Sequence, residues 1–262
     1  MSRGFTRDYL IEVAKGNVTG SYLVEKFGAN AALSNAIAPI ASAGVYQTPT
    51  AAVSLEFVSS AAGDALNGAG MHEITVVGLD ATWAEQTVVV AAHATNGTTA
   101  VALTGTWLRV YRAYVSSSGT YATMAAGSHV GTITIRVASA GATYANIPLS
   151  NSFPVGQSLI GAYTVPLGYT AYILSQAYSS DVSGTKDTTF YFFKRENADD
   201  VAASYSGIMR IQNLIAGTQG ADHIIHTANE AFPAKTDIGF LGITDSGTFF
   251  ASVQFELLLV AN

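Results

Sequence analysis

The sequence predicts an all-β protein built from antiparallel strands, and three observations lead to this prediction. Apolar and polar residues alternate in short runs from about residue 52 to the end of the chain, a pattern typical of strands with one face on a core. Turn-forming residues separate these runs at intervals of roughly ten residues, without long helical patterns between them. The chain is 49% hydrophobic and only 11% charged, so much of it can be buried between sheets.

At 262 residues, the chain is long enough for one large β-domain or for two ordinary ones. We predict two tandem antiparallel β-sandwich or jelly-roll-like domains, preceded by an extended N-terminal arm. The arm covers residues 1–50, the first domain residues 51–150 and the second domain residues 151–262. One continuous large sandwich is the alternative arrangement.

The first segment, residues 1–50, differs in composition from the rest of the chain. A third of all basic residues lie here, namely Arg3, Arg7, Lys15 and Lys26. Its apolar residues alternate in two short runs that are split by the glycine-containing residues 16–20, and residues 29–43 have no firm period. An arm on a neighbouring subunit and an edge strand followed by a loop both fit this pattern. We favour the arm, because so long a stretch with little periodic content is unusual as a loop of a compact domain.

The strands of the first half are separated by clear turn signals. We predict them at residues 53–58, 72–79, 87–92, 106–115 and 131–137. Asn96-Gly97 predicts a hairpin with a type I′ turn, because both central residues of that turn need a positive φ. Residues 139–156 are rich in Ala, Ser, Asn and Gly, and they are the candidate domain boundary.

The second half is richer in aromatic residues. Its predicted strands are residues 158–165, 169–178, 188–195, 207–214, 235–243 and 249–260. The alternation is cleanest over residues 251–259, where every second residue is apolar. Residues 190–193 (FYFF) indicate a strand buried on both faces; stacking of sugars on exposed rings is the alternative interpretation.

Composition excludes several classes of protein. The absence of cysteine excludes disulfides and thiolate metal sites, and fits a protein made in a reducing cytoplasm. A formal net charge of −6 argues against a surface that neutralises phosphates, so we expect no nucleic-acid partner. A signal peptide and a membrane span are disfavoured, because the chain contains no apolar run of the required length. The low charge favours a protein that is held in an assembly.

A search for catalytic or metal-binding residues finds no convincing set. His223 and His226 lie close in the sequence, but a metal site would need a third ligand. The acidic clusters are Asp80 with Glu85, Asp181 with Asp187, and Glu196 with Asp199 and Asp200. All of these clusters lie in predicted turns, where Asp bonds its own backbone. We therefore expect no enzyme activity, no cofactor and no metal.

Several motifs together resemble a family of tailed-phage virion structural proteins that is frequent in marine phage genomes. The most specific are EVAKGNVTGS at residues 12–21 with VEKFG at 24–28, and AYTVPLGYTAY at 162–172. The others are VSSA at 58–61, ITVVGLD at 74–80, WLRVYRA at 107–113, GTITI at 131–135 and GQSL at 156–159. The resemblance implies a capsid decoration (cement) protein or another head- or tail-associated β-protein, and it supplies no catalytic residues. The alanine-rich residues 91–102 depart from the family pattern.

The function expected from these observations is that of a non-enzymatic virion protein that decorates and stabilises the major capsid protein lattice. The expected partners are the major capsid protein and further copies of this chain in a homotrimer, without a membrane. The protein would be made in the host cytoplasm and lie on the capsid surface. The expected partner-binding residues of the arm are Lys15, Gly16, Asn17, Val18, Lys26 and Phe27.

Two alternatives stay open at this point. The first is a tail, neck or receptor-binding component that presents loops to host-surface glycans, with residues 179–186 and 196–204 as the candidate loops. The second is a glycan depolymerase on a β-scaffold, which would require a pair of carboxylates at a cleft.

Overall fold

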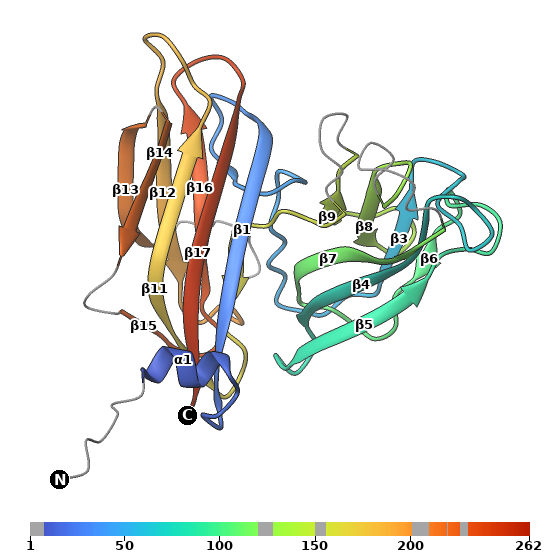
Figure 1. Cartoon of the computed structure of the whole chain (residues 1–262), viewed down its shortest axis with the longest axis horizontal. Helices are drawn as coiled ribbons and strands as arrows, with labels where there is room; N and C mark the ends of the chain where they lie inside the picture. The colour runs from blue at the N-terminus through green and yellow to red at the C-terminus, as the bar shows by residue number, and fades with distance from the viewer. Residues whose placement is uncertain (1–7, 120–127, 150–155, 201–209, 219, 226–229) are drawn as a thin grey trace.

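The protein is almost entirely β-structure, as the sequence predicts. The computed structural model describes residues 8–119, 128–149, 156–200, 210–218, 220–225 and 230–262. Within them lie seventeen strands and one six-residue helix, and the paired strands run antiparallel. The strands form four sheets, which lie in two bodies side by side (Figure 1).

The larger body, here called the long-strand pair, consists of two five-stranded sheets. The first sheet has the order β1-β17-β11-β14, with β15 beside β11. Its strands are β1 (Ser21–Leu33), β11 (Tyr169–Ser180), β14 (Gly220–Ile225), β15 (Ala231–Phe232) and β17 (Phe249–Ala261). The second sheet has the order β10-β16-β12-β13, with β2 beside β16. Its strands are β2 (Ala38–Pro39), β10 (Ala162–Thr164), β12 (Thr188–Arg195), β13 (Arg210–Thr218) and β16 (Asp237–Thr244).

The smaller body, here called the short-strand pair, consists of a four-stranded and a three-stranded sheet. The four-stranded sheet, in the order β6-β3-β8-β9, contains β3 (Leu55–Ser59), β6 (Val101–Ala102), β8 (Ile133–Val137) and β9 (Thr143–Ile147). The three-stranded sheet, in the order β5-β4-β7, contains β4 (Met71–Leu79), β5 (Glu85–Ala91) and β7 (Arg109–Ser118). Most strands of both bodies overlap the runs predicted from the sequence.

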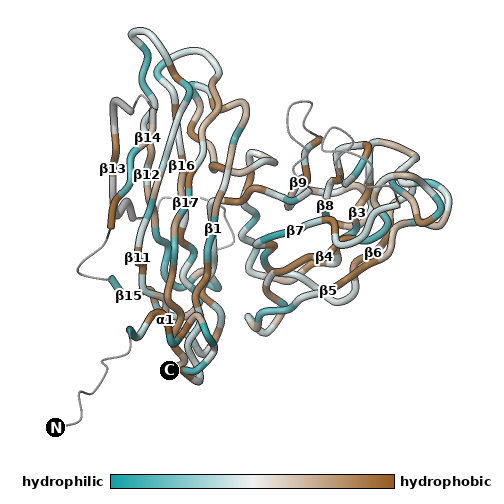
Figure 2. The backbone as a smooth tube through the Cα atoms, in the orientation of Figure 1, coloured by the Kyte–Doolittle hydropathy of each residue, from teal (hydrophilic) through white to brown (hydrophobic). Residues whose placement is uncertain are grey.

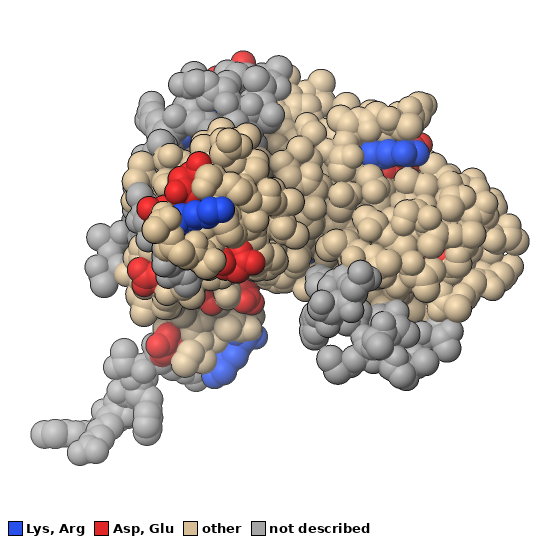
Figure 3. Space-filling model, turned by 90° about the horizontal axis from the view of Figure 1, so that it is seen from above, with Lys and Arg blue, Asp and Glu red and all other residues tan. Residues whose placement is uncertain are grey.

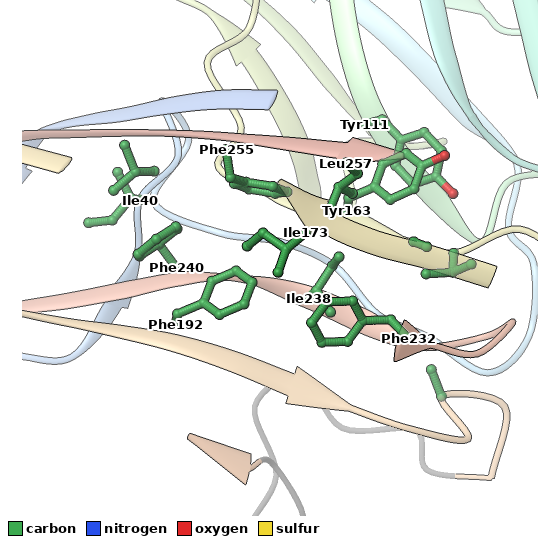
Figure 4. Close-up of a cluster of buried hydrophobic side chains, with 14 of the residues drawn as sticks. Ile40, Tyr111, Tyr163, Ile173, Phe192, Phe232, Ile238, Phe240, Phe255 and Leu257 are labelled. Carbon is green, nitrogen blue, oxygen red and sulfur yellow. The ribbon is translucent and has the colours of Figure 1, made fainter. Parts of the chain in front are cut away.

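Each pair of sheets encloses a hydrophobic core. In the long-strand pair, Phe192 of β12 packs against Phe240 and Phe255, with ring centroids 5.0 and 6.0 Å away (Figure 4). In the short-strand pair, Ile74 of β4 and Ile135 of β8 belong to a second cluster. The inward-facing residues of facing sheets thus fill each core, which explains the period of two in the sequence.

The two cores meet at the junction between the bodies. Leu79, Trp83, Leu108 and Tyr111 come from the short-strand half of the chain, but they belong to the buried cluster of the long-strand pair. The bodies are therefore joined by packed apolar side chains as well as by the chain itself.

The first fifty residues differ from the predicted arm. β1 pairs with β17 over most of its length, from Ser21 opposite Val260 to Leu33 opposite Phe249. The backbone of β1 also passes very close to a neighbouring segment, because a Cβ added at Gly28 would lie 2.2 Å from the Gly161 nitrogen. Residues 21–33 are therefore an integral edge strand, which corrects the arm prediction for this part of the chain and matches its alternative.

A short helix precedes β1 where the sequence shows an alternating run. α1 (Tyr9–Ala14) begins after Asp8, whose carboxylate accepts a hydrogen bond from the Leu10 amide at 3.0 Å. Asp is a favoured residue at this capping position. Val13 is the buried residue of the helix. Its side chain attaches the inner side of α1 to the body.

The prediction of a type I′ hairpin at Asn96-Gly97 is wrong. Neither residue has a positive φ, and the strands on either side, β5 and β6, pair with β4 and β3 instead. Gly97 is required for a different reason, because a Cβ there would lie 2.3 Å from the Asp64 carbonyl oxygen. The glycine allows two loops to approach each other.

Candidate functional site

The residues predicted to bind a partner do not form one surface. Lys15, Gly16 and Asn17 are exposed in the turn between α1 and β1, and Val18 is half-buried there. Gly16 has a φ of 74°, which a glycine adopts readily. Lys26 and Phe27 are neighbours in β1 and point to opposite faces of the sheet. Lys26 is buried toward the junction of the bodies, whereas Phe27 is half-buried on the outside.

The outer face of the first five-stranded sheet carries rows of side chains that the strand register fixes. One row consists of Leu23, Leu258 and Tyr172. The next consists of Glu25, Glu256, Ser175 and Ile225, and a third of Phe27, Gln254, Ala177 and His223. We call this surface the outer face. It has one apolar row at the α1 end and polar residues in its middle.

Exposed apolar side chains continue from the outer face onto α1. Tyr9, Leu10 and Ile11 of the helix are exposed, and Ile225 of β14 is 71% exposed. Leu10 and Ile225 line the same groove of about 470 Å³, together with Leu174 and Glu256. A second groove of about 410 Å³ is lined by Phe27, Ser179 and Ser252. Contiguous exposed apolar surface of this kind marks interaction sites in soluble proteins.

Charged side chains are sparse on the surface as well as in the sequence. In the view from above, most of the molecule is uncharged, and the acidic and basic groups are scattered (Figure 3). The tube in Figure 2 shows hydrophobic colouring along β5, an edge strand of which every second residue is exposed. Val89, one residue past its centre, is 59% exposed. Such a surface has little long-range charge repulsion to oppose close packing of neighbours.

Three buried charges join the two bodies at their junction. Asp237 of β16 accepts hydrogen bonds from Arg109 of β7 at 3.0 and 3.2 Å, and it also pairs with Arg195 of β12. The side chains are 1%, 0% and 1% exposed for Asp237, Arg109 and Arg195 respectively. A buried carboxylate between two guanidinium groups satisfies charges that would otherwise be very costly in the interior.

Polar neighbours complete this junction. The Thr164 hydroxyl donates to Asp237 at 2.5 Å and lies 2.8 Å from the Tyr46 hydroxyl. Arg109 also donates to the Pro49 carbonyl oxygen at 2.9 Å. The hydrogen bonds thus connect the segment after β2, the short-strand pair and the long-strand pair, and they fix the orientation of one body on the other.

A cleft of about 330 Å³ opens beside this junction. It lies between β1 and Tyr163 of the long-strand pair and β4, β5 and β7 of the short-strand pair. The residues that line it include Tyr22, Lys26, Glu85, Tyr111, Arg112, Tyr114 and Tyr163. The rings of Tyr111 and Tyr163 lie 4.4 Å apart at its base, and Figure 4 shows them side by side. We call this hollow the junction cleft.

Lys26 is the most perturbed base of the junction cleft. Its ammonium donates a hydrogen bond to the Tyr111 carbonyl oxygen at 2.6 Å, and the residue is 6% exposed. Burial lowers the pKa of Lys26 to about 7, with a further lowering by Arg112 and an opposing effect of Glu85. Glu85 accepts a hydrogen bond from the Tyr163 hydroxyl at 3.3 Å, and burial raises the pKa of Glu85.

The stability of the protein should therefore depend on pH through Lys26. Between pH 7 and the ordinary lysine pKa, the unfolded chain binds the proton that the folded chain has lost, so the free energy of unfolding rises with pH. Lys26→Met removes this dependence. The free energy of unfolding of wild type should therefore rise over that of Lys26→Met by about 1 kcal/mol per pH unit between pH 7 and pH 9, as measured by urea unfolding. Lys15→Met, at an exposed position, is the matched control, and curves for Lys26→Met and wild type that run parallel across this range would contradict the assignment.

The carboxylate clusters considered from the sequence lie in separate structural positions. Asp80 caps its own turn by accepting from the Thr82 amide at 2.7 Å. Asp181 accepts from the Phe250 amide at 2.8 Å, and Asp199 pairs with Lys235 at 2.5 Å. Of the candidate loops, residues 179–186 are described, whereas residues 201–204 lie outside the described residues.

Of the two histidines considered as a metal-binding pair, His223 is exposed on β14, and His226 lies outside the described residues. Within the described ranges, the structure contains no group of three or more His, Asp or Glu side chains placed to hold a metal ion. In the same part of the chain, the sole helix is too short to cross a bilayer.

The residues of the buried junction are not among those predicted from the sequence. A signal was present for Arg109, because it lies two residues from both Trp107 and Tyr111. In a strand these three side chains point to the same face, so Arg109 occupies an inward position. A charged residue at such a position requires a buried partner. No local pattern points to Asp237 as that partner, since it lies more than a hundred residues away in the chain.

Comparisons with known proteins give little guidance. No family model matches the chain, and no curated protein matches it. Among solved structures, an Arthrobacter globiformis T6 isomalto-dextranase complexed with panose is 13% identical, with a TM-score of 0.23, over 90% of this chain and 35% of that chain. T=1 particles derived from infectious bursal virus give 12% identity and a TM-score of 0.24 over 93% of this chain and 70% of that chain. The Gt strain of infectious bursal disease virus gives 10% identity and a TM-score of 0.21, over 97% and 78% of the two chains.

The chain therefore spans about a third of the length of the isomalto-dextranase that it matches. Similarities at these TM-scores establish neither a shared fold nor a shared function.

Proposed function

We propose that this protein is a non-enzymatic structural component of a virion, and that it decorates the major capsid protein lattice through its outer face. The observation that carries the proposal is the group of exposed apolar side chains on α1 and on the adjoining part of the outer face, including Leu10, Leu23 and Ile225. The sparse surface charge and the resemblance of its motifs to phage virion proteins support the same function. The proposal includes the jelly-roll-like character of the sheets, the homotrimer and the location on the capsid surface.

The outer face has the size that a specific contact needs. β1 and β17 each contain 13 residues, and β11 contains 12. With about 3.4 Å per residue and about 4.8 Å between strands, these strands and β14 present roughly 700 Å². A standard interface buries about 800 Å² per partner. One such contact can be weak, but contacts repeated over a lattice act together and raise the overall affinity.

Substitutions on the outer face should weaken binding to capsids. Leu23 is 40% exposed and Ile225 is 71% exposed on this surface, so a charge at either position would be buried against the partner. We expect Leu23→Asp and Ile225→Asp to weaken binding to empty capsids of the same phage about tenfold or more, measured by co-sedimentation. Val89→Asp changes an apolar residue of the other body that is 59% exposed, between the values for Leu23 and Ile225, and should bind like wild type.

Point variants test this contact better than deletion of the N-terminal residues would. Deletion through Ala29 would remove most of β1 from its sheet, so loss of binding would only report unfolding. The point variants leave the strand in place. If both outer-face variants bind as tightly as wild type, the outer face is not the capsid contact.

A receptor-binding role is the second candidate. The loop that follows β11 is open to solvent at Asp181, Ser183 and Thr185, so it can present polar groups at one end of the molecule. A reproducible hit of the isolated protein on a glycan array, lost on mutation of this loop, would favour that role over capsid decoration.

A further inference from the structure

We infer that the junction cleft binds a carboxylated sugar residue, such as a uronic acid. This binding activity is additional to the proposed structural role and does not depend on it. The cleft of about 330 Å³ lies within the size range of small-ligand sites, and it lies between two bodies, where such sites are common.

The charges in the cleft favour an acidic group on the ligand. Lys26 and Arg112 both line the cleft. Within the described residues, the Lys26 ammonium donates one hydrogen bond, to the backbone carbonyl oxygen of Tyr111. Two of its three N–H groups are therefore left for a ligand. Arg112 is exposed and donates to Gln157 at 2.6 Å, so its guanidinium is held at the rim. A ligand carboxylate between these two groups would reduce their mutual repulsion and form charge-assisted hydrogen bonds.

The two acidic residues of the cleft are already engaged by neighbours. Glu25 accepts from the Gln254 amide at 2.7 Å on the outer face. Glu85 accepts from the Tyr163 hydroxyl, and its carboxylate retains acceptor capacity for further hydroxyl groups. Glu85 therefore suits the hydroxyl groups of a ligand, whereas Lys26 and Arg112 suit its carboxylate.

Aromatic side chains supply the contact for a sugar ring. Tyr22 and Tyr114 line the cleft and are half-exposed. The Arg112 guanidinium lies 5.2 Å from the centroid of the Tyr114 ring, and the Tyr22 ring packs edge-on against Tyr169 at 5.4 Å. Both rings are thus held in place, with an apolar face and a polar tip available to an amphipathic ring. A hydroxylated ring with one carboxylate matches the combination of groups in the cleft.

The test compares three ligands on the full-length protein by NMR titration. Glucuronate carries both ring hydroxyls and a carboxylate, glucose lacks the carboxylate, and acetate lacks the ring. We expect glucuronate to bind at least tenfold more tightly than either of the others. Equal binding of acetate would show a simple anion site, and equal binding of glucose would show no role for the carboxylate; either result would overturn the proposal, as would no binding of glucuronate.

Variants locate the binding to the junction cleft. Arg112→Gln and Lys26→Met should each weaken glucuronate binding at least tenfold. Arg136→Gln, which alters an arginine paired with Glu56 in the other sheet of the short-strand pair, should leave it unchanged. If Arg112→Gln and Lys26→Met both bind glucuronate like wild type while remaining folded by circular dichroism, the cleft is not the site.

Proton uptake gives an independent measurement. The titratable and charged groups that line the cleft with Lys26 are Tyr22 and Glu25 of β1, Glu85 of β5, Tyr111, Arg112 and Tyr114 of β7, and Tyr163 of β10. A bound carboxylate would add negative charge beside Lys26 and raise its pKa from about 7. We expect protons to be taken up on binding at pH 7.5, and affinity to fall between pH 6 and pH 8.5. Binding without proton uptake would contradict contact of the ligand with Lys26.

Discussion

Replacing Asp237 with asparagine should lower the free energy of unfolding by about 3–5 kcal/mol. Asp237 is the carboxylate that Arg109 and Arg195 share in the buried junction. Asparagine has nearly the same volume but no charge, so both guanidinium groups would stay buried without their counterion. The same change removes the hydrogen bond that Thr164 donates to a charged acceptor. The loss is measured by urea denaturation at pH 7.

The matched control is Asp245→Asn, at an exposed position just after the end of β16. It replaces a carboxylate with an amide in the same way, and it should shift the free energy of unfolding by less than about 0.5 kcal/mol. If Asp237→Asn differs from this control by less than about 1 kcal/mol, the buried ion pairs do not hold the two bodies together in the way we describe.

Phe192→Ala should be comparably damaging, with a loss of about 3–5 kcal/mol. Phe192 contacts Phe232, Phe240 and Phe255 from three other strands, at centroid distances of 5.0 to 6.3 Å. Its removal leaves a cavity between the two five-stranded sheets, which the packed rings around it cannot fill. Urea unfolding followed by near-ultraviolet circular dichroism would report the loss from the aromatic core itself.

Phe250→Ala is the corresponding control, because this phenylalanine is 41% exposed at the start of β17. Its loss removes little buried area, so the expected effect is below about 1 kcal/mol. Similar losses for the two variants would show that the facing sheets are not packed through Phe192.

The fold class could be predicted because most strands have one face on a core. Residues 251–259 alternate without interruption, and β17 has alternating burial over the same residues. β1 was assigned to the arm because the inward positions of its second half, after Tyr22 and Val24, are not apolar. Lys26 reaches the Tyr111 carbonyl oxygen, Gly28 lies against Gly161, and the Asn30 amide donates to the Pro39 carbonyl oxygen at 3.2 Å. These contacts involve other parts of the chain, so the sequence of β1 alone does not show them.

The candidate site was less predictable than the fold. Lys15 and Lys26 are expected from the sequence on one partner-binding arm, but Lys15 lies in an exposed turn and Lys26 faces the junction cleft. The cleft brings together β1, β5, β7 and β10, which are distant in the sequence. Its combination of lysine, arginine and tyrosines therefore forms only in the folded molecule, and no local sequence motif indicates it.

The number of copies in each purified virion is the most direct test of the proposed structural role. Quantitative mass spectrometry against the major capsid protein measures this ratio without any variant. Decoration of the capsid lattice predicts hundreds of copies per particle, in a fixed ratio to the capsid protein. About a dozen copies or fewer, the number that a single ring at the neck or tail supplies, or absence from the particle, would contradict capsid decoration.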